Sequence, residues 1–320
     1  MGKGQQMNDF EKKSNAMARA AWLYYGEELT QSQIAEKLNV SRSTVIRMIQ
    51  SAREIGLVRI TIGVASDTFE LERDLENRYG LRMVRLVPEA VDDQMQRRWL
   101  GQAAAEMLIE LARDDSTIAL SWGATMQAMA DSLKGSTTRK GMLTVALNGG
   151  LHNASRGTNP HEVAEQVGQF FGATSYSLYA PVYVRNEATA AGLYRDSGVQ
   201  EALNLARNAA LVVFSFGGIQ QSATMLKLGY VTPDEREFLL RNGAVGEIAG
   251  RWIDRDGATV RTPLTIHPIG ITVEELKRIP ERMAVAGGAE KLNAIRAALK
   301  GGLVTHFVSD ERTALDLLGR

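Results

Sequence analysis

From about residue 67 onward, the chain alternates segments of helical periodicity with short apolar runs typical of buried strands. The predicted helices are 69–79, 94–113, 125–133, 160–171, 200–208, 273–277, 289–299 and 310–318. The predicted strands are 83–87, 117–120, 143–147, 173–179, 210–214, 282–286 and 304–308. Because this alternation builds right-handed βαβ units, we predict an α/β domain over 65–320 with a Rossmann-like, mostly parallel sheet. The irregular stretch 243–267 is expected to hold small strands around a turn at Asp256–Gly257.

Composition limits the classes of protein and site that are open to the chain. Its 320 residues suggest two domains, and 44% hydrophobic and 23% charged residues are usual for globular proteins. The sequence has no cysteine, which excludes disulfides, thiolate metal sites and a cysteine nucleophile. No apolar run reaches the roughly 18 residues of a membrane span, and the polar N-terminus lacks the apolar stretch of a secretory signal. We therefore expect a cytoplasmic protein with no membrane partner.

Residues 1–64 carry the signals of a helix-turn-helix domain, which we predict to be winged-helix-like. Thr30 and Gln33 fit a capping box at the start of one helix. Asn39 suits the left-handed turn that ends it, and Ser41 can cap a second helix. Two short helices joined by so tight a turn are typical of a DNA-binding domain.

The second of these helices has the polar face that DNA recognition needs. Residues 1–64 contain nine Lys and Arg against six Asp and Glu, so this head is mildly basic. Arginine can pair with guanine, and hydroxyl groups can bind phosphates. We predict double-stranded operator DNA as the partner, although a helical hairpin with a solvated face has a similar pattern. The predicted DNA-contacting residues are Gln33, Ser41, Arg42, Ser43, Thr44 and Arg47. The alternating run 57–62 predicts a strand that could belong to a wing.

Three loops that follow predicted strands are rich in glycine and small residues: 121–125, 148–150 and 215–218. In an open parallel sheet the carboxyl ends of the strands are where ligands bind. Glycine lets backbone N–H groups approach an anion, and the start of a helix adds a positive dipole. We therefore predict an anionic ligand in preference to plain tight turns. None of the loops has the spacing of a dinucleotide or Walker motif, so we expect no cofactor.

Three charged residues stand out near these loops. Lys291 follows a glycine pair and could reach a ligand phosphate, or it could be an exposed helix lysine. Asp254 and Glu247 flank the irregular stretch and could accept hydrogen bonds from sugar hydroxyls, or they could be turn and surface acids. The four histidines, at 152, 161, 267 and 306, do not have metal-ligand spacing, so we expect no metal site.

Several longer motifs occur in order along the chain. The head reads AAWLYYGEELTQSQIAEKLNVSRSTVIRMIQSAREIGLVRI, and the body contains SWGAT, LNGG, RNGAVGEIAGRWID, AVAGGAEKLNAIRAAL and GGLVTHFVSDERTAL. From about residue 17 to 318, this order resembles the SorC family of sugar-responsive bacterial transcription regulators. The resemblance is close to the subgroup of autoinducer-2-phosphate and polyol operon regulators.

The resemblance implies a sugar-isomerase-type effector domain that binds a phosphorylated sugar or polyol, in a homo-oligomer that is a dimer or a tetramer. It implies a phosphate at 123–125, a second ligand loop at 149–151, and contacts from Asp254 and Lys291. Some relatives carry Lys where Asn148 stands, and that Lys can form a Schiff base with an aldehyde sugar. Because Asn cannot do so, we predict noncovalent binding. The predicted effector-binding residues are Gly123, Ala124, Thr125, Asn148, Gly149, Gly150, Leu151, Glu247, Asp254 and Lys291.

The predicted function is regulation of a carbohydrate or polyol catabolic operon by binding of this effector. The alternative is a sugar-phosphate isomerase or deaminase-like enzyme with a DNA-binding appendage, in which Asp254, Glu247 and Lys291 would supply acid–base groups. The sequence shows no His–carboxylate constellation, and a metabolic enzyme has no need of a DNA-reading head. We therefore predict no enzymatic activity and no catalytic residue.

Overall fold

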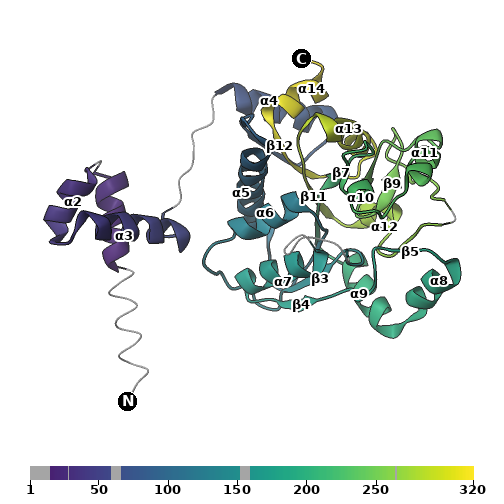
Figure 1. Ribbon diagram of the computed structural model, residues 1–320, viewed down its shortest axis with the longest axis horizontal. Coiled ribbons are helices and arrows are strands. Elements are labelled where there is room, and N and C mark those ends of the chain that lie inside the picture. Colours follow the sequence, from purple (N-terminus) through teal and green to yellow (C-terminus); the bar gives the residue numbers. More distant parts are fainter. Residues whose placement is uncertain (1–14, 28, 59–65, 152–158, 264) are drawn as a thin grey trace. The chain divides into compact units, whose positions relative to one another are not determined.

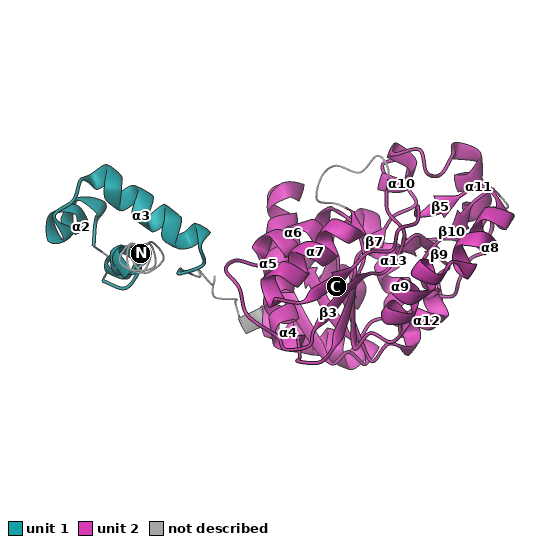
Figure 2. Ribbon diagram, turned by 90° about the horizontal axis from the view of Figure 1, so that it is seen from below, with its two compact units in different colours: residues 1–63 teal, residues 64–320 magenta. Residues whose placement is uncertain are grey.

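The computed structural model describes residues 15–27, 29–58, 66–151, 159–263 and 265–320. The chain divides into two compact units, residues 1–63 and 64–320 (Figure 2). The predicted wing strand at 57–62 lies outside the described residues from position 59 onward. None of the helices that the structure describes is long and apolar enough to cross a membrane.

The smaller unit packs three helical segments around a small apolar core. Residues 15–25 are helical, and α2 (Gln31–Leu38) and α3 (Arg42–Glu54) follow. The buried core residues are Ala20, Leu23, Ile34, Val45 and Ile49. Because α2 and α3 are joined by only three residues, they form the predicted helix-turn-helix.

Local hydrogen bonds determine where α2 and α3 begin and end. Thr30 and Gln33 form the predicted capping box at the start of α2. Asn39 ends α2 with φ 51° and ψ 47°, a left-handed conformation that asparagine adopts more readily than most residues. Ser41 caps α3 by accepting a hydrogen bond from the Thr44 N–H. Loss of such a cap typically costs about 1 kcal/mol, so these side chains are expected to hold the start of α3 in place.

The larger unit is built on a seven-stranded sheet with the order β1-β12-β11-β6-β2-β3-β4. All of its neighbouring strands are parallel, which confirms the predicted parallel sheet. The strands are β1 (Met83–Val87), β2 (Thr117–Leu120), β3 (Leu143–Ala146), β4 (Thr174–Tyr176), β6 (Leu211–Phe214), β11 (Glu281–Val285) and β12 (His306–Asp310).

Helices cover both faces of this sheet (Figure 1). One face is covered by α5 (Asp93–Leu111), α6 (Ala124–Ser132) and α7 (Pro160–Phe171). The other face is covered by α4 (Ser66–Tyr79), α9 (Ser197–Arg207), α12 (Val273–Arg278), α13 (Leu292–Lys300) and α14 (Glu311–Leu318). In β2, Ile118 and Leu120 pack against the face covered by α5, α6 and α7, and Ala119 packs against the opposite face. Because both of their faces are buried, central strands such as β2 and β6 are apolar runs, which made them recognisable in the sequence.

The strand order places the ends of β2 and β6 side by side. From β2 the sheet extends outward through β3 to β4, and from β6 it extends in the opposite direction through β11 and β12 to β1. Such a reversal leaves a crevice outside the carboxyl ends of the two central strands. Open α/β sheets bind their ligands at this point.

Smaller elements pack beside this edge of the sheet. β7, β8 and β9 form an antiparallel sheet, and β5 pairs with β10. The elements are β5 (Tyr183–Val184), α8 (Glu187–Arg195), β7 (Phe216–Gly217), α10 (Thr224–Lys227), α11 (Pro233–Arg241), β8 (Gly246–Ile248), β9 (Arg251–Ile253) and β10 (His267–Pro268). Their core contains Trp252 and also Trp122 from the loop after β2, so it is joined to the sheet. Of these elements, only the small strands within 243–267 were predicted. The two-residue strands are too short to show periodicity, and the helices α8, α10 and α11 were also missed.

The structure corrects several predicted boundaries. The helices expected at 69–79 and 200–208 each begin three residues earlier, as α4 and α9. The strand expected at 173–179 is limited to β4, which lies at the edge of the sheet and has one neighbour. The strand expected at 304–308 begins two residues later, because β12 pairs with both β1 and β11 from His306 onward. The helix expected at 289–299 begins as a 3₁₀ turn, η1 (Ala289–Lys291), before α13.

Candidate ligand cavity and nucleic-acid interface

A cavity of about 590 Å³ lies at the carboxyl edge of the sheet, at the switch point between β2 and β6. Its wall is formed by the loops after these two strands, the first turns of α5, part of α10, β8 and the η1 turn. Gly123, Ala124 and Thr125 of the first predicted loop line it together with Glu247 and Lys291. The fold thus brings five of the predicted effector-binding residues into one cavity.

The loop after β2 presents the start of α6 to the cavity. Gly123 is the N-cap with φ 121° and ψ 163°, and no side chain caps the helix. This φ favours glycine, and a Cβ at this position would meet no other atom, so the backbone conformation explains the glycine. The first N–H groups of a helix have no partner within it, and here Ala124 and Thr125 carry them at the cavity wall. Together with the helix dipole they favour an anion.

Glu247 of β8 is a carboxylate in the cavity wall that is only 3% exposed. Its Oε2 accepts a 2.6 Å hydrogen bond from the N–H of Gly250, in the turn between β8 and β9. A Cβ on Gly217 would lie 2.1 Å from Glu247 Oε1, so this glycine of the third predicted loop makes room for the carboxylate. Burial raises the pKa of Glu247 to about 7, while the Gly250 N–H and the charge of Lys291 act to lower it. Glu247 therefore titrates near neutral pH.

Lys291 lies in the cavity wall at the end of η1 rather than within α13. Gly288 precedes this turn with φ 93°, and the turn brings the lysine beside the ends of the strands. Burial lowers the pKa of the Lys291 ammonium group, and the charge of Glu247 opposes this effect. The two residues therefore interact electrostatically within the wall of one cavity.

None of the four described residues of the second predicted loop, after β3, lines this cavity. The N–H groups of Gly149 and Gly150 already donate to backbone carbonyl groups, and that of Leu151 donates to a side chain. A Cβ on Gly149 would lie 2.3 Å from Pro181 O, and one on Gly150 would lie 2.6 Å from His161 Nε2. These glycines allow close packing, and the geometry does not support the expectation that their amides hold an anion.

Asn148 comes directly after β3, is fully buried and pairs with Gly270 in an antiparallel bridge. Its Nδ2 donates to Gly149 O, and its Oδ1 has no partner within the described chain. The side chain therefore keeps one unused acceptor in the second predicted loop, outside the lining of the cavity.

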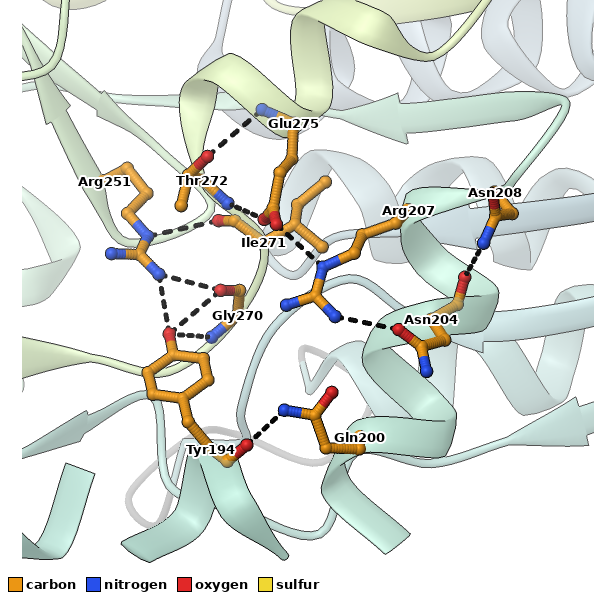
Figure 3. Close-up of polar contacts among 10 residues, drawn as sticks. All are labelled: Tyr194, Gln200, Asn204, Arg207, Asn208, Arg251, Gly270, Ile271, Thr272 and Glu275. Atoms are coloured by element: carbon orange, nitrogen blue, oxygen red, sulfur yellow. Dashed lines mark hydrogen bonds and ion pairs between the residues drawn. The ribbon is translucent and has the colours of Figure 1, made fainter. Parts of the chain in front are cut away.

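A polar network fixes the segment around Gly270 that packs on Asn148. Figure 3 shows Arg251 of β9 and Tyr194 of α8 meeting at this segment. Arg251 Nη2 donates to Gly270 O over 2.7 Å and to the Tyr194 hydroxyl over 2.8 Å. The hydroxyl in turn lies 3.0 Å from Gly270 O. Because β9 pairs with β8, the network links the strand next to Glu247 to the second predicted loop.

Asp254 follows β9 and does not line the cavity. Its Oδ1 accepts hydrogen bonds of 2.9 Å from the N–H groups of Asp256 and Ala258. These bonds form the turn that was predicted at Asp256–Gly257. One oxygen of the Asp254 carboxylate is thus engaged by its own turn, and its contact with a ligand stays a prediction to which this geometry adds no support.

Several cavity residues were not predicted. Gln96, Arg97 and Leu100 line it from one face of α5, which in the sequence has the appearance of an ordinary helix surface. Ser215, after β6, is 9% exposed and lines the cavity, and its Oγ has no partner among the described residues. The third glycine loop was the only signal in the sequence that pointed toward Ser215.

The described histidines take part in local packing. His306 of β12 is 4% exposed, and its Nδ1 lies 2.9 Å from Thr305 Oγ1. Burial lowers the pKa of His306, while Glu281 acts to raise it. In the part of the chain that the structure describes, no group of three or more His, Asp or Glu side chains could hold a metal ion.

The exposed face of α3 is the candidate DNA interface of the smaller unit. Arg42, Ser43 and Arg47 are exposed on it. Arg42 Nε donates to Gln31 over 3.4 Å, whereas Arg47 has no hydrogen bond or ion pair with the described residues. Gln50, one turn beyond Arg47, is also exposed on this helix and was not predicted.

The other predicted DNA-contacting residues also serve the helix caps. Ser41 Oγ lies 2.9 Å from Ser43 Oγ and 2.8 Å from Thr44 Oγ1, so three hydroxyl groups gather at the start of α3. Gln33 Oε1 accepts from the N–H and the hydroxyl of Thr30. These residues remain predicted contacts, and their caps position the arginines of α3.

Both units match known families. A family of helix-turn-helix domains matches residues 21–62, and a family of sugar-binding domains matches residues 64–319. The transcriptional regulator LsrR of Enterobacter sp. (strain 638) is 33% identical over 308 residues, covering 94% of this chain and 92% of that protein. The deoxyribonucleoside regulator of Bacillus subtilis is 30% identical over 312 residues, covering 96% and 98%.

The fold as a whole also has a solved counterpart. The crystal structure of the full-length sorbitol operon regulator SorC from Klebsiella pneumoniae superimposes with a TM-score of 0.78 at 23% identity. The superposition covers 94% of this chain and 97% of that one. At this level of identity the comparison shows a shared fold.

Proposed function

Because this chain belongs to the SorC family of sugar-responsive, DNA-binding transcription regulators, we propose that it controls a carbohydrate or polyol catabolic operon in response to a phosphorylated sugar or polyol. The relatives named above are transcription regulators, so the chain is a regulator and not an enzyme.

The observation that carries this proposal is the composition of the cavity at the switch point. The first turn of α6 and Lys291 provide positive potential for a phosphate group. Glu247, which titrates near neutral pH, can exchange hydrogen bonds with ligand hydroxyls. An anion site and a hydroxyl-binding carboxylate in one cavity fit a phosphorylated sugar or polyol better than a neutral sugar.

We further propose that the ligand binds noncovalently. An amine is needed to form a Schiff base with an aldehyde. The loop after β3 holds Asn148, and the amine of Lys291 in the cavity is assigned to the phosphate group. Treatment with borohydride in the presence of the bound sugar phosphate should therefore leave the intact mass of the protein unchanged. A mass increase equal to the reduced adduct would contradict this.

The functional unit is proposed to be a dimer or a tetramer. The head carries only a small positive charge, so a single head would bind DNA weakly at physiological salt. Paired helix-turn-helix heads match two-fold operators. Light scattering should give a mass of two or four times 35.0 kDa.

A thermal-shift screen tests the proposed ligand class directly. The full chain is heated with a panel of sugar and polyol phosphates, each paired with its unphosphorylated counterpart. A ligand present at about 100 times its Kd adds roughly 2.7 kcal/mol of stability, so at least one phosphorylated compound should raise Tm while its counterpart does not.

Lys291→Met provides the matched control for this screen. The substitution keeps a long apolar side chain but removes the ammonium group from the cavity, and it should abolish the shift. If unphosphorylated sugars stabilise the protein as strongly as their phosphates, the phosphate assignment is wrong.

A further inference from the structure

Arg97 of α5 is a cationic residue in the cavity wall that no contact within the described chain explains. It is partly buried and lines the cavity. Asp93 lies one turn earlier on the same helix, at the spacing of a helical ion pair. No ion pair forms between them, and Arg97 makes no hydrogen bond to any described residue. Its guanidinium is therefore available to a ligand.

The packing of α5 on α6 determines how far along the helix axis Arg97 lies relative to the first turn of α6. A Cβ on Gly101 would lie 2.5 Å from the backbone of Ala128, so the two helices touch at this pair of residues. Both helices leave parallel strands at the carboxyl edge and run in the same direction. Arg97 lies four residues before Gly101, and Ala124 lies four residues before Ala128. Arg97 is thus level with the first turn of α6.

The charges around this point leave room for an anion. Arg97 and Lys291 both line the cavity, and each acts on the other with a repulsive charge, since Arg97 contributes to the lowered pKa of Lys291. In the described chain Lys291 also has no ion pair. The acids whose charges act on Lys291 are Glu247, Glu290 and Asp93, and Glu290 Oε1 already accepts from Ser222 Oγ. None of these acids forms an ion pair with Arg97 or Lys291 in the described chain, so both cations can still bind an anion.

Ser215 supplies a separate indication of a polar ligand here. Its Oγ is buried in the cavity wall without a partner among the described residues. Buried hydroxyl groups normally have a hydrogen-bond partner. Ser215 follows β6, and β6 is the neighbour of the strand that leads into α6, so Ser215 and the first turn of α6 both line this cavity.

We propose that Arg97 is a specificity-determining residue of this cavity, whose guanidinium binds the phosphomonoester group that also meets the first turn of α6 and Lys291. The inference rests on the proposed function and adds Arg97 to the first turn of α6 and Lys291 as a third group that binds the anion. Arginine suits this role because its planar fork can donate two parallel hydrogen bonds to one phosphate. The residue would thereby distinguish phosphorylated ligands from neutral ones.

Inorganic phosphate is the probe for the test, titrated into the full chain by calorimetry against chloride at equal ionic strength. The variants are Arg97→Gln and Arg97→Lys, with Arg98→Gln as the matched control, because Arg98 is the adjacent exposed arginine and does not line the cavity. Arg97→Gln should weaken phosphate binding by about 10- to 100-fold, as the loss of a charged hydrogen bond predicts. Arg97→Lys, which keeps the charge but not the fork, should fall between, and Arg98→Gln should stay within twofold of the wild type.

The outcomes separate this inference from the proposed function. If the wild type and Arg97→Gln bind phosphate equally while Lys291→Met loses it, the role of Arg97 is wrong and the proposed function stands. If the wild type does not bind phosphate at all, the inference is wrong, and the thermal-shift screen with sugar and polyol phosphates decides the proposed function. The Tm of each variant without phosphate establishes that it is folded, and Arg97→Lys remains informative if Arg97→Gln does not fold.

Discussion

At the scale of single residues, Glu247 has the electrostatic environment that is easiest to test. It is almost fully buried, and its pKa is raised from an ordinary 4.5 to about 7. Between these values the folded protein holds a proton that the unfolded chain has lost. The folded state therefore binds more protons there, and stability falls as pH rises through this range.

Glu247→Gln should remove this dependence. Relative to the wild type, the free energy of unfolding of the variant should increase by up to about 3 kcal/mol between about pH 5 and about pH 8. Urea denaturation at the two pH values measures the change. Glu290→Gln, which changes an exposed acid of the same cavity, serves as the control and should show little pH-dependent difference. An equal effect of Glu247→Gln at both pH values would show that Glu247 does not titrate in this range.

Arg47 is the residue of α3 with the clearest freedom to contact a base. Arg47→Ala should weaken binding to DNA selected from a random pool by about 1–3 kcal/mol and should relax the preference at one base pair. Fluorescence anisotropy at fixed salt measures the loss. Arg241→Ala removes an equal charge from an exposed position on the larger unit and should have little effect. Similar losses for the two variants would remove Arg47 from the DNA interface.

At the scale of elements, the network of Figure 3 joins α8, β9 and the segment before α12. Tyr194→Phe removes a hydroxyl that accepts from Arg251 and lies next to two backbone carbonyl groups. The free energy of unfolding should drop by about 1 kcal/mol. Tyr179→Phe is the control, since this tyrosine is 85% exposed. A change no larger than that of the control would mean that water replaces the contacts of Tyr194.

The elements differ in how well the sequence predicts them. Strands such as β2 and β6 are buried on both faces, so their continuous apolar runs locate them almost to the residue. The strands β5, β7 and β10 contain two residues each. They are strands only because each pairs with a neighbouring strand that lies far away in the sequence. Local capping signals work well, as at Asn39 and Ser41, because the hydrogen bonds concerned lie within a few residues.

The residues of the site also differ in how well the sequence predicts them. Glycine after a strand correctly indicated the start of α6, but at Gly149 and Gly150 the same signal reflects close packing against Pro181 and His161. Sequence alone does not separate these two uses of glycine. Arg97 was missed because its importance depends on the contact between Gly101 and Ala128, which places it at the cavity. Asp254 was predicted as a ligand contact, whereas its carboxylate holds its own turn.

At the scale of the whole molecule, ligand binding in the larger unit can regulate transcription only if it alters DNA binding by the smaller unit. A ligand can alter DNA binding only if its affinity differs between the DNA-bound and free proteins. The coupling is reciprocal, so DNA must change the affinity for the ligand by the same factor. This requirement holds whether the ligand releases the protein from its operator or strengthens its binding.

Anisotropy titration of a selected operator, with and without the phosphorylated ligand identified by the thermal-shift screen, tests this central claim most directly. At constant salt, a saturating ligand should change the Kd for DNA by about fivefold or more, which is the lower range of allosteric coupling. Lys291→Met should bind the operator as the wild type does but should not respond to the ligand. A ligand that binds tightly and leaves the Kd for DNA unchanged would contradict the account.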